Sequence, residues 1–118
     1  MEFLLMIVEA HGDRDSRSEA EGRALYDEMV RFGEGLAARG QLLASRSLRP
    51  DTHGVRVKQD GGRQVLRDGP FAEAKEMVGG FFLIDCGDRE EAVAIAAQCP
   101  AARFASVEVR ECAPCYVR

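Results

Sequence analysis

Two segments of the chain are apolar at every position, residues 3–8 and residues 81–84. Consecutive side chains of a strand point to opposite faces, so this pattern predicts two strands that are covered on both faces. Polar and apolar residues alternate instead in residues 106–110, as in a strand with one face in water. Residues 42–48 form a further predicted strand, which ends before Pro50.

A β-hairpin is predicted in the middle of the chain. Val55 and Val57 alternate with basic residues, and a second short segment follows at residues 64–66, Gln64-Val65-Leu66. Asp60-Gly61-Gly62 separates the two, and glycine next to aspartate is typical of the tight turns that join two antiparallel strands.

The longest predicted helix follows the first strand. Its apolar stripe recurs at steps of four, three and four residues, as one face of a helix does, through Leu25, Met29, Phe32 and Leu36. Two overlapping capping boxes precede the stripe, one from Ser16 to Glu19 and one from Ser18 to Glu21. Gly40 is the predicted stop, because glycine adopts the left-handed conformation that ends many helices.

A second helix is predicted after the strand at residues 81–85. Asp88 suits its N-cap, and Glu91, three residues later, completes a capping box. Pro100 ends this helix. Its expected inner face comprises Ala92, Ile95, Ala96 and Cys99.

The predicted order is strand–helix–strand, a hairpin, and again strand–helix–strand. Two such units in 118 residues predict a ferredoxin-like α+β sandwich with an antiparallel sheet and two main helices, as one domain over residues 1–118. Two helices cover only one face of such a sheet. The other face would expose a contiguous apolar area of roughly 300–400 Å², at or above what a soluble monomer leaves open. We therefore expect a homodimer that packs through the open sheet face.

Composition excludes several classes of protein. The net charge is −4 and no basic run stands out, which argues against a nucleic-acid-binding protein. No stretch approaches the ~20 apolar residues of a membrane span. The apolar run at residues 3–8 is too short for a secretory signal, so we expect a cytoplasmic protein. In that reducing compartment the four cysteines are expected to be buried, small apolar residues.

The stretch from Arg67 to Phe82 carries most of the candidate chemistry. Asp68-Gly69-Pro70 is expected to stop the preceding strand, and Pro70 suits the first turn of a short helix. Such a helix would place Phe71 beside Lys75, and Ala72 beside Glu76. Gly79-Gly80 would then release the chain into the strand at residues 81–84.

We expect this stretch to line a pocket together with the first helix and the sheet. Lys75 or Arg67 would bind an anionic ligand, and Phe71 would form a wall. Asp68, Glu73 or Glu76 would act as acid or base, since a half-buried carboxylate beside a lysine can have a shifted pKa. The alternative is that Asp68 only ends a strand and the other charges are solvated.

Other titratable residues carry weaker signals. His11 follows the first strand together with Asp13, where a histidine could serve as a base, although an exposed turn residue is the alternative. His53 lies in a polar turn beside Asp51. Cys112 and Cys115 have redox-motif spacing, but no helix follows them and no second cysteine pair completes a metal site. The glycine pairs match no nucleotide-binding motif, so no metal or cofactor is predicted.

Residues 68–76, D-G-P-F-A-E-A-K-E, and the following G-G-F-F-L-I-D resemble the signature of the DGPF-domain group of YCII-related proteins. The resemblance extends to the first strand, to the corner at residues 48–50, to residues 55–57 and to the last strand. It implies a ferredoxin-like subunit in a dimeric α+β barrel. Some relatives are similar to lyases or dehydrochlorinases that act on hydroxylated aromatics through a histidine–aspartate pair. The histidine would fall on the first helix, where this chain has Met29, a ligand-contacting position in that comparison.

Two functions follow as hypotheses. One is a small-molecule-binding protein that acts as a lyase or isomerase on a small organic acid or hydroxylated aromatic. The other is a non-catalytic ligand- or protein-binding module with an accessory regulatory role. The sequence leaves open whether the protein is an enzyme, and it is equally compatible with a structural dimer unit.

Overall fold

A computed structural model describes residues 1–118. It contains two helices, six strands and two short 3₁₀ turns, in the order β1 (Glu2–Ala10), α1 (Glu19–Ala38), β2 (Leu42–Ser47), η1 (Asp51–His53), β3 (Val55–Asp60), β4 (Arg63–Asp68), β5 (Glu76–Asp85), α2 (Arg89–Gln98), η2 (Pro100–Arg103) and β6 (Ser106–Glu111). No helix is long and apolar enough to cross a membrane.

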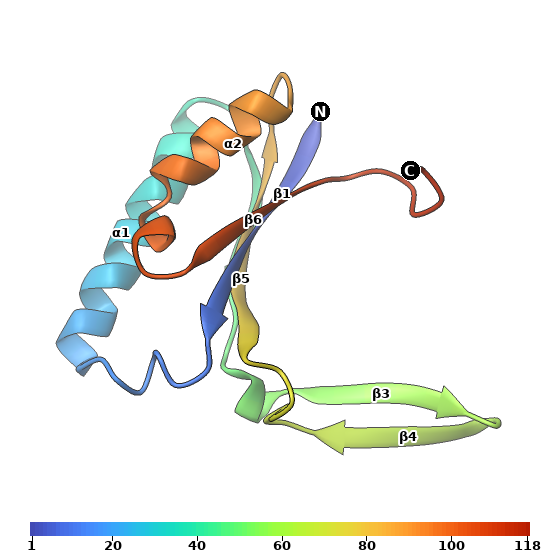
Figure 1. Cartoon of the computed structure of the whole chain (residues 1–118). Helices are drawn as coiled ribbons and strands as arrows, with labels where there is room; N and C mark the ends of the chain where they lie inside the picture. Colours follow the sequence, from blue (N-terminus) through green and yellow to red (C-terminus); the bar gives the residue numbers. More distant parts are fainter.

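Four of the strands form one antiparallel sheet in the order β2-β5-β1-β6. Both helices lie on the same face of this sheet (Figure 1). The connection through α1 joins β1 to β2, and β5 lies between these two strands. The connection through α2 joins β5 to β6, and β1 lies between those two. This is the ferredoxin-like α+β arrangement, and the prediction from the order of elements is confirmed.

The core lies between the sheet and the helices. On β1 it takes Phe3, Leu5 and Ile7, which alternate with residues on the opposite face, and on α1 it takes Leu36. The expected inner face of α2 is confirmed, because Ala92, Ile95, Ala96 and Cys99 are all buried.

The face of the sheet opposite the helices is apolar along its two central strands. Leu4, Met6 and Val8 of β1 are half-buried there, beside Phe81 and Leu83 of β5. The expectation that both faces are fully covered is therefore not met within one chain. The homodimer that would cover this face stays a prediction.

Local sequence determines where both helices begin. Ser18, not Ser16, caps α1: Ser18 Oγ accepts from the backbone N–H of Glu21, and Glu21 Oε1 accepts from that of Ser18. Gly40 follows the helix with φ +70°, as predicted. At α2 the Asp88 cap is also confirmed, but the carboxylate of Glu91 accepts from Gly87 N, one residue before the cap, so the reciprocal half of the box is absent.

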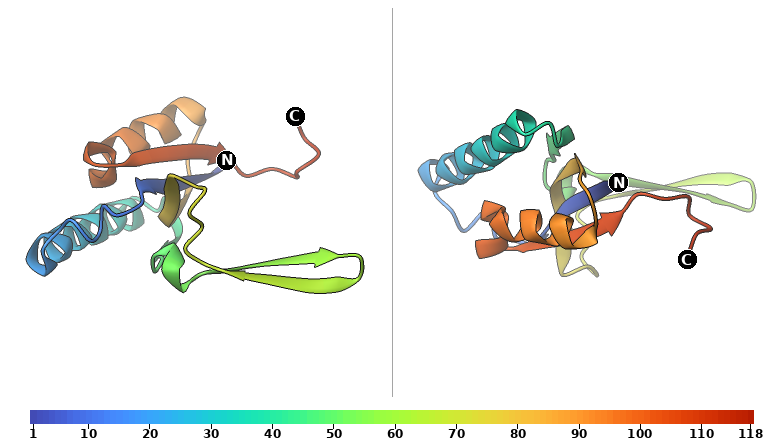
Figure 2. Two further views of the ribbon diagram at one scale, coloured as in Figure 1. Left: turned by 60° about the horizontal axis from the view of Figure 1, so that its bottom comes forward. Right: turned by 90° about the horizontal axis from the view of Figure 1, so that it is seen from above.

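The predicted hairpin forms as β3 and β4, with Gly61 and Gly62 at positive φ in its turn. It makes a separate two-stranded sheet, and every residue of both strands is exposed. Figures 1 and 2 show it extending from the body of the molecule with no helix over it.

The central stretch differs from its prediction in two respects. Residues 70–76 form no helix: after the Gly69-Pro70 bond, which is cis, Ala74 N donates to Phe71 O in a single turn. Gly79 and Gly80 lie inside β5 and do not precede it. The reason is tertiary, since residues 76–78 pair with residues 8–10 of β1 and extend both strands beyond their apolar runs.

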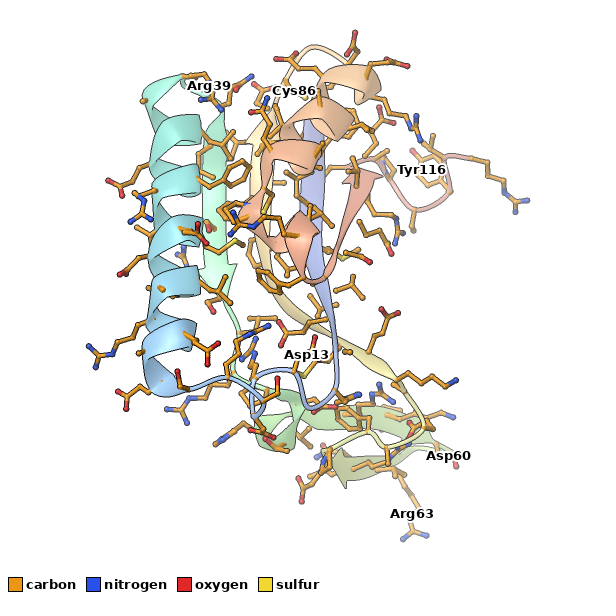
Figure 3. The ribbon with its side chains drawn as sticks, turned by 60° about the vertical axis from the view of Figure 1, so that its left-hand side comes forward. Asp13, Arg39, Asp60, Arg63, Cys86 and Tyr116 are labelled. Atoms are coloured by element: carbon orange, nitrogen blue, oxygen red, sulfur yellow. The ribbon has the colours of Figure 1, made fainter.

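The cysteines divide into two pairs. Cys86 and Cys99 are buried, as expected, whereas Cys112 and Cys115 are exposed, which corrects the expectation for all four. The exposed pair lies in the C-terminal segment that also carries Tyr116 (Figure 3). The segment follows the end of β6 at Glu111, and its residues 112–118 are all exposed.

Replacing Ser18 with alanine is expected to lower the free energy of unfolding by about 1 kcal/mol, because the capping bond to Glu21 N is lost. Urea denaturation followed by circular dichroism measures this change. Ser16→Ala is the matched control, since Ser16 bonds only the carbonyl of Asp13 and caps no helix. An equal loss in both variants would contradict the assignment of the cap.

Candidate functional site

A cleft of about 1090 Å³ lies between α1 and the sheet. Its walls come from β1, α1, β2 and β5, with Phe104 closing one side. Aromatic residues form much of the apolar lining, namely Tyr26, Phe82 and Phe104. A concave site with apolar walls and a few polar groups is the usual form of a small-molecule site.

A buried ion pair forms part of the lining. Glu9 is 5% exposed, and its carboxylate accepts from Arg14 Nε at 2.6 Å. Arg14 Nη1 and Nη2 also donate to the carbonyl oxygens of Leu48, at 2.8 Å, and Gly79, at 3.2 Å. The Arg14 side chain therefore joins the end of β1 to the end of β2 and to the first half of β5. A buried carboxylate destabilises a fold unless it is paired, and the bond from Arg14 neutralises the buried charge of Glu9.

The same pair explains why β5 needs glycine at position 79. A Cβ built there would lie 2.1 Å from Glu9 Oε2 and 2.8 Å from Arg14 Nη2. Only a residue without a side chain leaves the ion pair its space. Gly79 was expected to release the chain into the strand that follows. In the structure it lies within β5, where the absence of a side chain lets the strand lie close to the Glu9–Arg14 pair.

Two further arginines line the cleft without forming an ion pair. The Arg17 guanidinium lies 4.8 Å from the centroid of the Phe104 ring, and Arg46 Nη1 donates to the neighbouring carbonyl of Ser45. By contrast Arg23, also at the cleft, pairs with Glu19. Arg46 is the strand partner of Phe81 and so lies on the open face of the sheet, whereas Arg17 can offer its guanidinium to an anion in the cleft, which a planar carboxylate accepts in bidentate fashion.

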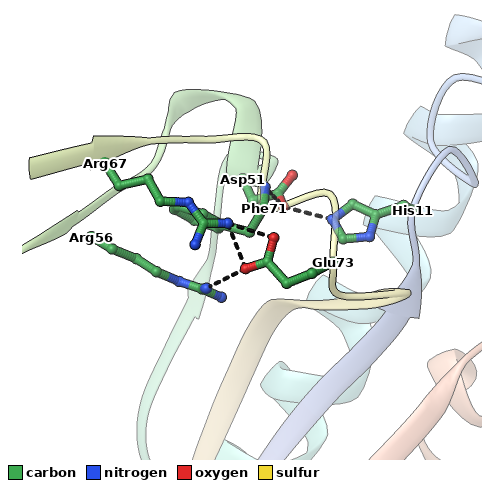
Figure 4. Close-up of polar contacts among 6 residues, drawn as sticks. All are labelled: His11, Asp51, Arg56, Arg67, Phe71 and Glu73. Carbon is green, nitrogen blue, oxygen red and sulfur yellow. Dashed lines mark hydrogen bonds and ion pairs between the residues drawn. The ribbon is translucent and has the colours of Figure 1, made fainter.

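His11 belongs to a different cluster, located where the end of β1 meets η1 and the central stretch. Its Nε2 donates to Asp51 Oδ2 at 2.6 Å, and Asp51 Oδ2 also accepts from Phe71 N at 3.2 Å (Figure 4). The backbone N–H of His11 donates to Lys75 O. The bond to Asp51 raises the pKa of His11, and the same bond lowers the pKa of Asp51. This histidine–aspartate pair joins the end of β1 to η1 and the central stretch.

The central stretch is held by a second set of charges around one aromatic ring. Phe71 is buried, and the Arg56 guanidinium lies 3.8 Å from its centroid. Glu73 accepts from Arg56 Nη1 at 3.0 Å and from Arg67 Nη2 (Figure 4). The bond from Arg67 is the main reason that the pKa of Glu73 falls to about 2. Arg67 and Glu73 thus satisfy each other, and Glu73 is held as a carboxylate.

The structure separates the residues that the sequence grouped together. Met29 lines the large cleft, while Phe71 and Glu76 line a second cavity of about 530 Å³ with Asp51, His53 and Arg56. Asp68 and Lys75 are exposed and line neither cavity. The central stretch borders the large cleft only with the residues of its end, from Gly79 to Phe82. The roles predicted for these residues stay predictions.

Several cleft residues were missed by the sequence analysis, namely Glu9, Arg14, Arg17, Tyr26 and Arg46. For Glu9 a signal existed: it follows Phe3, Leu5 and Ile7 in steps of two, which places a carboxylate on the buried face. Asp51 carried no local signal, because its partner His11 is forty residues away in the chain.

The chain belongs to the YCII-related family, since the family model of the YCII-related domain matches residues 1–115. The resemblance of the central stretch to that family is confirmed. An uncharacterized protein of Rhizobium meliloti (strain 1021), R00369, is 41% identical over 54 residues. That match covers 46% of this chain and 44% of the relative, so it spans less than half the length of the curated relative.

Among solved structures the fold is similar to 5-chloro-2-hydroxyhydroquinone dehydrochlorinase (TftG) from Burkholderia phenoliruptrix AC1100, in complex with 2,5-dihydroxybenzoquinone. The TM-score is 0.55, and the superposition covers 96% of this chain and 94% of the other. At 16% sequence identity this likeness shows the fold alone.

Gly79→Ala is expected to destabilise the protein by about 1–3 kcal/mol, because the new methyl group would displace the Glu9–Arg14 pair. Chemical denaturation measures the change. Gly22→Ala is the matched control: a Cβ at that helical position meets nothing within 4 Å, so it should stabilise α1 by about 0.5–1 kcal/mol. A neutral Gly79→Ala would show that the ion pair tolerates the added group.

The His11–Asp51 pair predicts a pH-dependent stability. Because the pKa of His11 is raised above 6.5, its contribution is complete below pH 6.5 and is lost as the pH rises through the raised pKa. Because the pKa of Asp51 is lowered from 3.8, its contribution is complete above pH 3.8 and is lost on further acidification. His11→Gln should therefore lower the midpoint of urea denaturation more at pH 5.5 than at pH 9.

The matched control is His53→Gln, which removes the chain's other histidine, a side chain without an ion pair. If His11→Gln and His53→Gln showed the same difference between pH 5.5 and pH 9, the Asp51 contact would not be the source of the pH dependence.

Proposed function

We propose that this protein binds a small, anionic, hydroxylated aromatic molecule or organic acid in the cleft between α1 and the sheet. The observation that carries the proposal is the Arg17 guanidinium, which lies beside the Phe104 ring in an aromatic-walled cavity and forms no ion pair. An aromatic acid or a phenolate matches both features, because its ring stacks on the aromatic walls and its anionic oxygens accept from an arginine.

Membership of the YCII-related family and the similarity to a dehydrochlorinase crystallised with a dihydroxybenzoquinone support the same class of ligand. The volume supports it as well, since about 1090 Å³ accommodates a single substituted ring with room for water.

Binding without turnover is the form of this function that the site supports best. A lyase or isomerase step needs a group that accepts a proton close to the ligand. Glu73 is held by two arginines and His11 by Asp51, and neither lines the cleft. Of the carboxylates that line it, Glu9 is bonded to Arg14 and Glu19 to Arg23, and Asp27 is exposed. Catalysis by His11, Asp68, Glu73 or Glu76 stays a prediction.

We also propose that the active species is a homodimer packed through the open sheet face. Leu4, Met6, Phe81 and Leu83 form a half-buried apolar surface on the side away from the helices. Covering it with the same surface of a second copy removes this area from water at roughly 25 cal/mol per Å².

The binding proposal is tested by calorimetric titration with 2,5-dihydroxybenzoquinone, salicylate and gentisate. Arg17→Met should raise the Kd about tenfold or more for the compound that the wild type binds, because one charge-assisted hydrogen bond is lost. An absorbance spectrum of the bound compound that stays constant over hours would support binding without turnover.

Arg31→Met is the matched control, because Arg31 is an exposed residue of α1 that does not line the cleft. The proposal fails if the wild type binds none of these compounds, or if Arg31→Met weakens binding as much as Arg17→Met does.

A further inference from the structure

The β3–β4 hairpin, residues 55–68, is an arm without any covering layer. Every residue of Val55–Asp60 and Arg63–Asp68 is exposed, and the two strands pair only with each other. Figure 2 shows the arm extending well beyond the body of the molecule in both views, on the same side as the C-terminal segment. An isolated two-stranded ribbon is marginally stable in water, so a surface that packs against the arm would stabilise it.

One face of the arm is apolar where a partner could reach it. Val57 and Leu66 lie directly opposite each other in the ladder and are 62% and 58% exposed. Val55, two residues before Val57, is on the same face and is 53% exposed. A cross-strand pair of this kind, next to a third apolar side chain, is a compact patch suited to packing against another protein surface.

The base of the arm is held in a defined orientation. Arg56 and Arg67, directly opposite each other on the other face, both bond Glu73, and Arg56 lies over the buried Phe71 ring. The charges at the root are therefore used to hold the arm on the body. A preorganised arm loses little conformational freedom when it meets a partner.

The direction of the arm points to a second copy of this chain as the partner. The helices lie on one side of the four-stranded sheet and the arm extends from the other side, where the open apolar face is (Figure 1). Six residues per strand at about 3.3 Å each give an arm about 20 Å long, whereas two packed sheets lie about 10 Å apart. The arm is long enough to pass the sheet of a copy seated on the open face and to reach its helix layer.

Charge favours the same partner. The arm carries four basic and two acidic residues, a net charge of +2 in a chain of net charge −4, so the rest of the chain carries −6. Arg63 at the tip of the arm projects into solvent far from the body (Figure 3). A basic arm against an acidic body attracts another copy and, in a twofold dimer, forms the contact twice.

We infer that the β3–β4 arm clasps a second copy of this chain, packing Val57 and Leu66 against it when the open sheet faces associate. This inference rests on the proposed homodimer and adds to it a contact that the sheet face does not supply. It makes the arm part of the assembly and explains why an insertion between β2 and β5 is long, paired and exposed.

Sedimentation equilibrium over a range of protein concentrations tests the inference. The double variant Val57→Ser/Leu66→Ser should raise the dimer Kd about tenfold or more and leave the circular dichroism spectrum unchanged, since both residues are exposed in one chain. Gln59→Ser/Gln64→Ser is the matched control, because these residues form the next pair on the same face and are polar. Its Kd should stay within about twofold of the wild type.

Hydrogen exchange provides an independent readout. In the wild type, amides of the arm should become more protected as the concentration rises through the dimer Kd. A wild-type dimer whose Kd is the same in both double variants, with arm amides that exchange equally at all concentrations, would overturn the clasp and leave the sheet-face dimer intact. A wild type that is monomeric at every concentration would overturn both.

Discussion

The buried carboxylate of Glu9, near the end of β1, is the constraint on which the packing of β1, β2 and β5 around it depends. Glu9 continues the inward-facing series of β1, so the strand register places its carboxylate among buried groups. An unpaired charge there would cost several kcal/mol, and removing one partner of such a pair costs about 3–5 kcal/mol. Arg14 must therefore fold back from the loop after β1, and β5 must carry glycine where the two side chains meet.

The distribution of partners among the arginines decides where a ligand can bind. Arg14 is paired with Glu9, and Arg56 and Arg67 share Glu73. These three side chains hold the fold together. Arg46 lies on the open face of the sheet against the backbone of Ser45, and Arg17 lies against the Phe104 ring, so the charge of Arg17 is left for a molecule in the cleft. Residue type alone does not make this distinction, because all five are arginines in polar stretches of the sequence.

The central stretch shows how tertiary pairing overrides a local signal. A proline at a first helical position and two side-chain pairs spaced by four residues favour a helix by a few tenths of a kcal/mol per pair. Against this, residues 76–78 gain ladder hydrogen bonds to β1, and Phe71 is buried under Arg56. Burying a phenylalanine contributes about 1.5–3 kcal/mol, so the strand and a single turn form instead.

The amino-acid sequence alone predicts the order of elements, the Asp88 cap, the hairpin turn and the ferredoxin-like fold, and it narrows the cap of α1 to Ser16 or Ser18, because these features follow from periodicity and from contacts within a few residues. It also indicated the family through the central stretch, which the family match confirms. Which charges meet depends on the packing of the folded chain. His11 finds Asp51 across forty residues of chain, and Arg14 finds Glu9 and Gly79 across two strand ends, since such contacts depend on the packing of whole elements.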